Sequence, residues 1–210
     1  MKGQNSLSPE DITFFSDEDN WRYGPCYEIA LFIEHPISDE EMGKLLHEEL
    51  GFIPWTMTNS PQRSYSIFRD ARDRIPAFGL LHFPWHYEPD SLFPNQPQHR
   101  YFFVLYPAQF IRICGDYPHF EGGFDGHDYE NTRCLILCLM RVIQSVGKYF
   151  NVSGAAIQDE TYAMPFLKDG ITLSKGTLKY LQLPHVPALE EYERYGSVPL
   201  NADLDVLEKK

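Results

Sequence analysis

The sequence predicts a single α+β domain over residues 1–210, with two or three helices packed on a mostly antiparallel sheet of five to seven strands. A length of 210 residues suits one large domain. A composition of 43% hydrophobic and 15% aromatic residues is typical of a chain with a packed core. Short β-favouring segments and two longer segments with helical spacing occur along the chain. A polar acidic arm at residues 1–20 and a tail at residues 196–210 complete the expected domain.

The first half of the chain contains several strand segments and one well-marked helix. Residues 1–20 are polar and acidic, so we expect a loose arm or a short docking turn, with Phe14 and Phe15 as an anchor. Ser38 and Glu41 have the spacing of a capping box and are followed by apolar residues at helical intervals, which predicts a helix over residues 37–51. Gly51 then ends that helix. Strands are predicted at residues 26–34, 52–57, 64–68 and 77–83.

In the second half, residues 84–98 contain four prolines and several aromatic residues, which predicts an irregular but packed loop. Residues 131–150 predict a second long helix whose first half is apolar all round and therefore buried on every side. A shorter helix is expected over residues 172–183, with Ser174 as its cap, and a short helical stretch over residues 188–195. Strands are predicted at residues 101–106, 109–114 and 152–158.

The acidic residues are concentrated at one end of the sequence. Twelve Asp or Glu and only three Lys or Arg lie within residues 1–50, so this segment carries −9 of the formal net charge of −12. An acidic balance of this kind disfavours binding to nucleic acids and to anionic membranes, and it would steer a basic partner. Asp39, Glu40 and Glu41 complement the dipole of the predicted helix at its N-terminus. Glu48 and Glu49 lie at its opposite end, where local structure does not explain them.

These features favour an acidic protein-interaction module, similar in kind to an inhibitor or antidote of a basic protein. Glu48 and Glu49 are candidate binding residues because they are unexplained by the helix. Aromatic residues of the proline-rich loop are further candidates, since such side chains are enriched at binding hot spots; they are Trp85, Tyr87 and Phe93. An acidic surface that only confers solubility is the simpler interpretation.

A metal-dependent enzyme or small-molecule-binding protein is the alternative. The segment 119–130 (HFEGGFDGHDYE) brings histidines, carboxylates and three glycines together. Its candidate catalytic residues are His119, Glu121, Asp125 and His127, and the candidate metal ligands are His82, His86, His119 and His127. Imidazole and carboxylate groups bind Zn²⁺ or Fe²⁺, but the spacing matches no established metal motif. Helix capping and tight turns would explain the same segment without a ligand. No cofactor is therefore predicted, and a divalent metal remains an open alternative.

The cysteines and the apolar runs predict a cytoplasmic protein. Cys134 and Cys138 lie one helical turn apart among leucines, a pattern that favours core packing over a redox pair. The polar first ten residues do not resemble a signal peptide, and no apolar run approaches the roughly 20 residues that a membrane-spanning helix needs.

Overall fold

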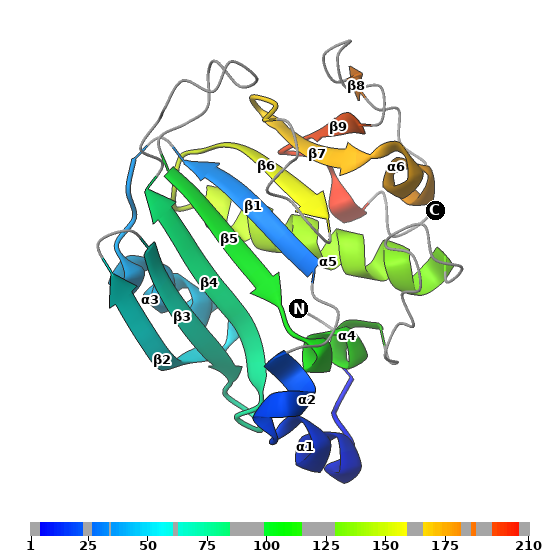
Figure 1. Cartoon of the computed structure of the whole chain (residues 1–210). Helices are drawn as coiled ribbons and strands as arrows, with labels where there is room; N and C mark the ends of the chain where they lie inside the picture. Colours follow the sequence, from blue (N-terminus) through cyan, green and yellow to red (C-terminus); the bar gives the residue numbers. More distant parts are fainter. Residues whose placement is uncertain are drawn as a thin grey trace.

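The computed structural model describes residues 5–22, 27–33, 35–60, 63–84, 99–114, 129–158, 166–181, 186–187 and 195–205. Nine strands form one sheet in the order β2-β3-β4-β5-β1-β6-β7-β9-β8 (Figure 1). Neighbouring strands are antiparallel except for β6 and β7, which are parallel. The predicted α+β class with a mostly antiparallel sheet is confirmed, although the sheet has more strands than expected. The strands are β1 (Tyr27–Ile33), β2 (Phe52–Ser60), β3 (Arg63–Asp70), β4 (Pro76–Pro84), β5 (His99–Leu105), β6 (Val152–Gln158), β7 (Gly170–Ser174), β8 (Val186–Pro187) and β9 (Tyr195–Pro199).

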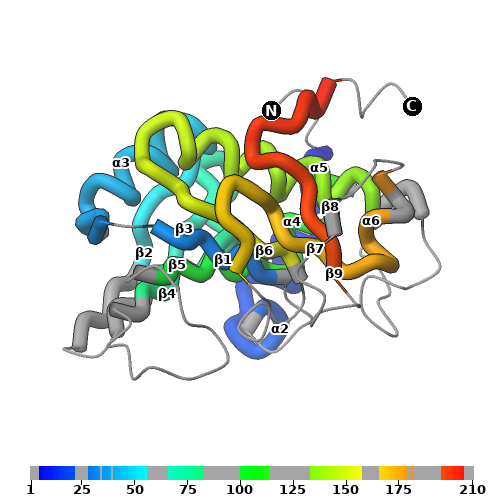
Figure 2. The backbone as a smooth tube through the Cα atoms, turned by 90° about the horizontal axis from the view of Figure 1, so that it is seen from above, coloured from blue at the N-terminus to red at the C-terminus, as the bar shows by residue number. Residues whose placement is uncertain are grey.

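Helices cover both faces of the sheet. The long helices α3 and α5 lie on one face and the N-terminal helices on the other (Figure 2). The main hydrophobic core forms between the sheet and α3, α5 and α6, and a second, smaller core lies beneath α1 and α2. The helices are α1 (Pro9–Phe15), α2 (Glu18–Arg22), α3 (Asp39–Leu50), α4 (Pro107–Cys114), α5 (Tyr129–Gly147) and α6 (Lys175–Leu181).

Strand β1 is central, as its composition predicts. It pairs with β5 on one side and with β6 on the other. Ile29, Leu31 and Ile33 belong to the main core, whereas Ala30 and Phe32 belong to a separate cluster. Because successive side chains of a strand point to opposite faces, the five consecutive apolar residues Ile29–Ile33 require that both faces of the strand are covered.

Helix α3 follows its sequence signals closely. The Ser38 hydroxyl accepts a hydrogen bond from Glu41 N at 3.2 Å, and the Glu41 carboxylate accepts one from Ser38 N at 3.0 Å. Gly51 ends the helix with φ of 73°, a left-handed conformation that costs glycine little. The Tyr101 hydroxyl of β5 accepts from Ile37 N and donates to Ile37 O, which ties the start of α3 to the sheet.

The long helix α5 is buried where its sequence is uniformly apolar. Its residues from Leu135 to Met140 are all buried, as expected for the first half of this segment, but Arg133 is only partly buried and Cys134 is exposed, so burial on every side begins later than predicted. In its second half, Arg141, Gln144 and Ser145 are only partly buried. Within the described residues, no helix combines the length and the apolar character that crossing a membrane requires.

The N-terminal segment is more ordered than the predicted loose arm. It forms α1 and α2, and Ser8 and Asp11 make a second capping box at the start of α1. Phe15 and Trp21 are each 3% exposed, and the Trp21 ring lies 5.0 Å from that of Tyr106. The two helices therefore dock on the sheet through their own apolar side chains. Phe15, and not Phe14, is the anchor.

Residues 109–114, which the sequence predicts as a strand, lie in helix α4. Pro107 occupies the first helical position, where its missing N–H costs nothing. Phe110 packs in the main core, whereas Ala108 and Ile111 pack in the core beneath α1 and α2. Because α4 has only eight residues and most of them are apolar, residue spacing alone cannot separate a short buried helix from a buried strand.

Near the C-terminus, the predicted helix 172–183 is shorter than expected, and a strand precedes it. Thr172 and Leu173 lie in β7, and α6 begins only after Ser174. Ser174 caps α6 as predicted, because its hydroxyl accepts a hydrogen bond from Thr177 N at 3.1 Å. Of the predicted short helix 188–195, Tyr195 begins β9, and residues 188–194 lie outside the described residues. Pairing of β7 with β6 and β9 gives Thr172 and Leu173 hydrogen-bond partners that local sequence cannot reveal.

Candidate functional site

The acidic residues that belong to helices within the first fifty positions lie on two separate surfaces, whereas Glu28 lies on β1. One set belongs to α1 and α2 and the other to α3, and the sheet lies between them (Figure 2). The side chains of β5 point alternately to these two faces of the sheet. Phe103 and Leu105 pack in the core that contains α3, whereas Val104 packs against the core beneath α1 and α2. The acids of the helices therefore form two patches and not a single continuous one.

On α3, the exposed acids Glu48 and Glu49 already have partners within the protein. Lys44 Nζ lies 3.9 Å from Glu48 Oε1, an exposed pair of the kind that contributes little to stability. The Tyr149 hydroxyl donates a hydrogen bond of 2.6 Å to Glu49 Oε1, and this bond together with the Glu49 charge raises the pKa of Tyr149. Glu49 thus connects α3 to the segment that follows α5, which accounts for one of the two acids that local sequence does not explain.

The capping carboxylate of α3 is held in its charged form. Hydrogen bonds from the Ser38 hydroxyl and from the Ser38 backbone N–H lower the pKa of Glu41 below its ordinary value. Glu41 is exposed, but its carboxylate is committed to the cap. Among the acids of α3 whose side chains the structure describes, this leaves Glu40 and Glu48 able to contact a partner without breaking a tertiary or capping interaction.

The surface of α1 and α2 combines exposed acids with an exposed aromatic ring, and we call it the α1–α2 surface. Phe14 is 54% exposed, which is unusual for a phenylalanine in a helix that is docked on a core. Four exposed acids belong to the same surface, namely Glu10, Asp17, Glu18 and Asp19. Glu10 lies one helical turn before Phe14 and therefore on the same side of α1.

The α1–α2 surface is held in place by hydrogen bonds between its own residues and by the buried ring of Trp21. Asn20 Nδ2 donates to Phe14 O at 2.9 Å, and Asp17 N donates to the same carbonyl at 3.3 Å. The Trp21 ring lies 5.7 Å from the ring of Trp55, which is 39% exposed and carries the Arg69 guanidinium 3.3 Å above its centre. Phe14 is therefore presented on a fixed backbone, and an exposed aromatic ring continues the surface onto β2.

Most of the predicted histidine and carboxylate site lies outside the described residues. The candidate residues that the structure does not describe are His86, His119, Glu121, Asp125 and His127, together with the loop residues Trp85, Tyr87 and Phe93. His82 lies on β4, where its ring stacks on Tyr101 with centroids 4.2 Å apart and an interplanar angle of 4°. Among the residues that the structure describes, no group of three or more His, Cys, Asp or Glu could hold a metal ion. The metal-dependent alternative stays a prediction.

Of the two cysteines of α5, only Cys138 has the core position that the sequence predicts for both, and the prediction is wrong for Cys134. Cys134 is exposed and Cys138 is 7% exposed. Burial, reinforced by the neighbouring Cys134, raises the pKa of Cys138 to about 12, so this thiol is protonated at neutral pH. A thiol that cannot ionise is a poor nucleophile, which is consistent with a packing role for Cys138.

Sequence reasoning missed two buried arginines. Arg112 of α4 is 1% exposed and forms ion pairs with Asp73 and, at 3.7 Å, with Asp70. Arg100 of β5 is 2% exposed and lies 4.6 Å from the ring centre of Phe32, and burial lowers its pKa to about 10. A single arginine within an otherwise apolar segment was the available signal for both.

Comparisons with known proteins identify no relative of this chain: no family model, no curated protein and no solved structure matches it.

Proposed function

We propose that the protein is an acidic interaction module that binds a basic protein partner, in the manner of an inhibitor or antidote, through the α1–α2 surface. The observation that carries the proposal is Phe14, an aromatic side chain that is 54% exposed and shares its surface with four exposed carboxylates. Aromatic anchors with a polar rim are typical of protein-binding hot spots. The free cysteines of α5 suit a cytoplasmic setting.

The two components would contribute in different ways. Burial of the Phe14 ring by a partner removes apolar surface from water and would slow dissociation. The carboxylates would accelerate encounter with a basic surface and would make that encounter sensitive to salt. The fixed backbone of α1 and α2 reduces the ordering cost of binding, because Asn20 and Trp21 already hold it.

The exposed side of α3, which carries Glu48 and Glu49, is the weaker candidate for binding a basic partner. Glu48 and Glu49, which the sequence favours as binding residues, are engaged with Lys44 and Tyr149 respectively. A partner that used Glu49 would compete with the Tyr149 hydroxyl, and one that used Glu48 would compete with the Lys44 ammonium. Substitutions on α3 therefore serve as the control for substitutions on the α1–α2 surface in the experiment below.

The experiment begins with affinity capture from the lysate of the native host at low and high salt. The captured partner is identified by mass spectrometry, purified, and studied by surface plasmon resonance. Three variants are compared with the wild type: Phe14→Ala, the triple variant Asp17→Asn, Glu18→Gln and Asp19→Asn, and the matched control Glu48→Gln with Glu49→Gln.

We expect Phe14→Ala to increase the dissociation rate by about tenfold or more, as expected for a central anchor. The triple variant should lower the association rate and flatten its salt dependence. At an ionic strength of about 0.15 M, the α3 control should behave as wild type. The proposal is wrong if the α3 control weakens binding while the α1–α2 variants do not, if all variants bind alike, or if no basic protein is captured at low salt.

A further inference from the structure

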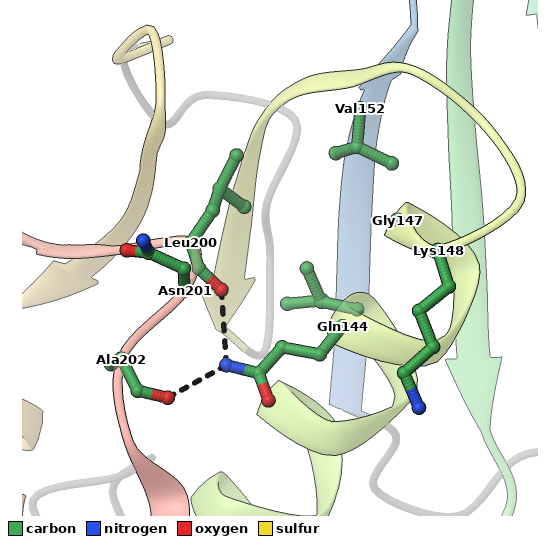
Figure 3. Close-up of a pocket in the computed structure, with 8 residues that line it drawn as sticks. Gln144, Gly147, Lys148, Val152, Leu200, Asn201 and Ala202 are labelled. Carbon is green, nitrogen blue, oxygen red and sulfur yellow. Dashed lines mark hydrogen bonds between the residues drawn. The ribbon is translucent and has the colours of Figure 1, made fainter.

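A pocket lies where the last turn of α5, the start of β6 and the segment after β9 meet (Figure 3). Its volume is about 410 Å³, which lies within the range of small-molecule sites. Ile143, Val152, Leu200 and Ala202 supply apolar lining. Ile143 is 1% exposed and belongs to the main core, so this side of the pocket is part of the rigid body of the domain.

One wall of the pocket is fixed by Gln144. Its Nε2 donates hydrogen bonds to Leu200 O at 3.0 Å and to Ala202 O at 2.8 Å (Figure 3). Because both partners are carbonyl oxygens, the amide orientation is determined: the nitrogen must face them. The Gln144 side chain of α5 thus holds the segment after β9 in place, which gives the pocket a defined shape.

Of the described residues that line the pocket, Lys148 alone is charged. It follows the last residue of α5 and borders the pocket on the side away from Leu200 and Ala202 (Figure 3). Three carbonyl groups at this helix end accept hydrogen bonds: those of Gln144 and Ser145 from Lys148 N, and that of Val146 from Tyr149 N and Phe150 N. The Lys148 ammonium, and not the helix end, therefore sets the sign of the charge that the pocket favours.

We propose that this pocket binds a small aliphatic monocarboxylate. The carboxylate would pair with the Lys148 ammonium, and the hydrocarbon tail would cover Ile143, Val152 and Leu200. The inference is independent of the proposed partner binding, because the pocket and the α1–α2 surface share no residue. A single exposed ammonium and a short tail provide modest affinity, so the dissociation constant is expected to be on the order of a millimolar.

The test is an NMR titration of ¹⁵N-labelled full-length protein with three probes of equal chain length: hexanoate, its neutral counterpart hexanamide, and the cationic hexylamine. Hexanoate should give saturable shifts of the backbone amides of Gln144, Gly147 and Lys148. Hexanamide should bind at least fivefold more weakly, and hexylamine should not bind at this site.

Two variants separate the charge from the cavity. Lys148→Gln removes the ammonium, and we expect it to weaken hexanoate at least fivefold. Gly147→Leu fills the space, and we expect it to abolish binding without unfolding the protein, because a Cβ at Gly147 meets no atom within 4 Å. Lys44→Gln, on exposed α3, is the matched charge control and should bind hexanoate as wild type does.

The inference is overturned by any of four results: hexanoate shifts that do not saturate, hexanamide or hexylamine binding as tightly as hexanoate, unchanged affinity in Lys148→Gln, or unchanged affinity in a folded Gly147→Leu variant. The dispersion of the amide spectrum reports whether each variant is folded. None of these results bears on binding at the α1–α2 surface.

Discussion

Replacing Asp70 by asparagine should reveal how much a buried ion-pair network contributes to the stability of this fold. Asp70 is 4% exposed and lies at the end of β3, next to the turn that leads to β4. Its carboxylate accepts hydrogen bonds from Arg72 Nε at 2.9 Å and Arg72 Nη2 at 2.7 Å, and it lies 3.7 Å from Arg112 Nη1. Arg112 also pairs with Asp73, so the network joins the turn to α4.

The expected loss is about 2–3 kcal/mol in the free energy of unfolding. Breaking a buried ion pair by removing one partner costs about 3–5 kcal/mol, because the other charge is left buried. Two features lower this figure here. Arg112 retains Asp73, and Arg72, whose side chain is 49% exposed, can turn towards water. Part of the loss in stability remains, because the asparagine amide group is a hydrogen-bond donor and cannot pair with the guanidinium donors beside it.

The same substitution should change how stability depends on pH. Burial alone would raise the pKa of Asp70, but the hydrogen bonds from Arg72 and the charges of Arg112 and Arg72 outweigh it, and the net pKa lies below the ordinary value of 3.8. Between the folded and unfolded pKa values the unfolded chain binds more protons, so stability rises with pH in that window. The contribution of Asp70 is complete above about pH 5 and is lost as the pH falls below about 4.

Urea denaturation followed by tryptophan fluorescence measures both effects, since Trp21 is buried in the native protein. The difference between wild type and Asp70→Asn should be about 2–3 kcal/mol at pH 7 and should narrow at pH 3. Glu18→Gln, on exposed α2, is the control and should change stability by less than about 0.5 kcal/mol. A difference below about 0.5 kcal/mol at pH 7, or one that is equal at pH 7 and pH 3, would refute the reasoning.

Three further predictions concern packing. Leu137→Asp should abolish soluble folding, because it buries an unpaired charge at a side chain that is 4% exposed in α5; soluble wild-type-like expression would contradict this. Gly154→Ala should destabilise the protein by more than about 1 kcal/mol, since its Cβ would lie 2.5 Å from Leu167 O. Gly43→Ala should instead stabilise α3 by up to about 1 kcal/mol, because the nearest atom to its Cβ would be 3.7 Å away. Thermal denaturation of the two variants and the wild type measures both effects. Cys138 should not react with a thiol reagent at pH 8 until the protein unfolds, because burial raises its pKa to about 12; mass spectrometry locates the modified residue.

Elements whose signals are local were predictable from the sequence. The start of α3 depends on Ser38 and Glu41, which bond to each other, and its end depends on Gly51 alone. Strand β1 was predictable as central because it contains apolar residues on both faces. Each of these signals requires no knowledge of a residue elsewhere in the chain.

Elements whose signals are non-local were not predictable. Helix α4 packs between two cores, and its eight residues form a short apolar run that spacing alone cannot separate from a buried strand. Thr172 and Leu173 form a strand because β6 and β9 pair with them, although the segment 172–183 has helical spacing when read alone. The N-terminal helices are stabilised by contacts such as that between Trp21 and Tyr106, which are 85 positions apart in sequence.

The candidate site shows the same distinction. Net charge can be counted from sequence, but the exposure of Phe14 and the bond between Tyr149 and Glu49 depend on how the chain folds back on itself. The pocket at the end of α5 joins residues 143–152 to residues 200–202, a pairing that no sequence spacing indicates.

The division of the acidic segment leads to a final prediction about salt. The chain from residue 1 to residue 50 passes through the sheet as β1, so α1 and α2 lie on one face and α3 on the other (Figure 1, Figure 2). A helix packed on a sheet is separated from the opposite face by about 10 Å or more, and the Debye length is about 8 Å at 0.15 M ionic strength. The α3 acids should therefore not affect association at the α1–α2 surface at that salt concentration. At about 0.01 M, where the Debye length is about 30 Å, the α3 control variant should also slow association. An effect of the α3 variant at 0.15 M would show that the two acidic patches act as one surface.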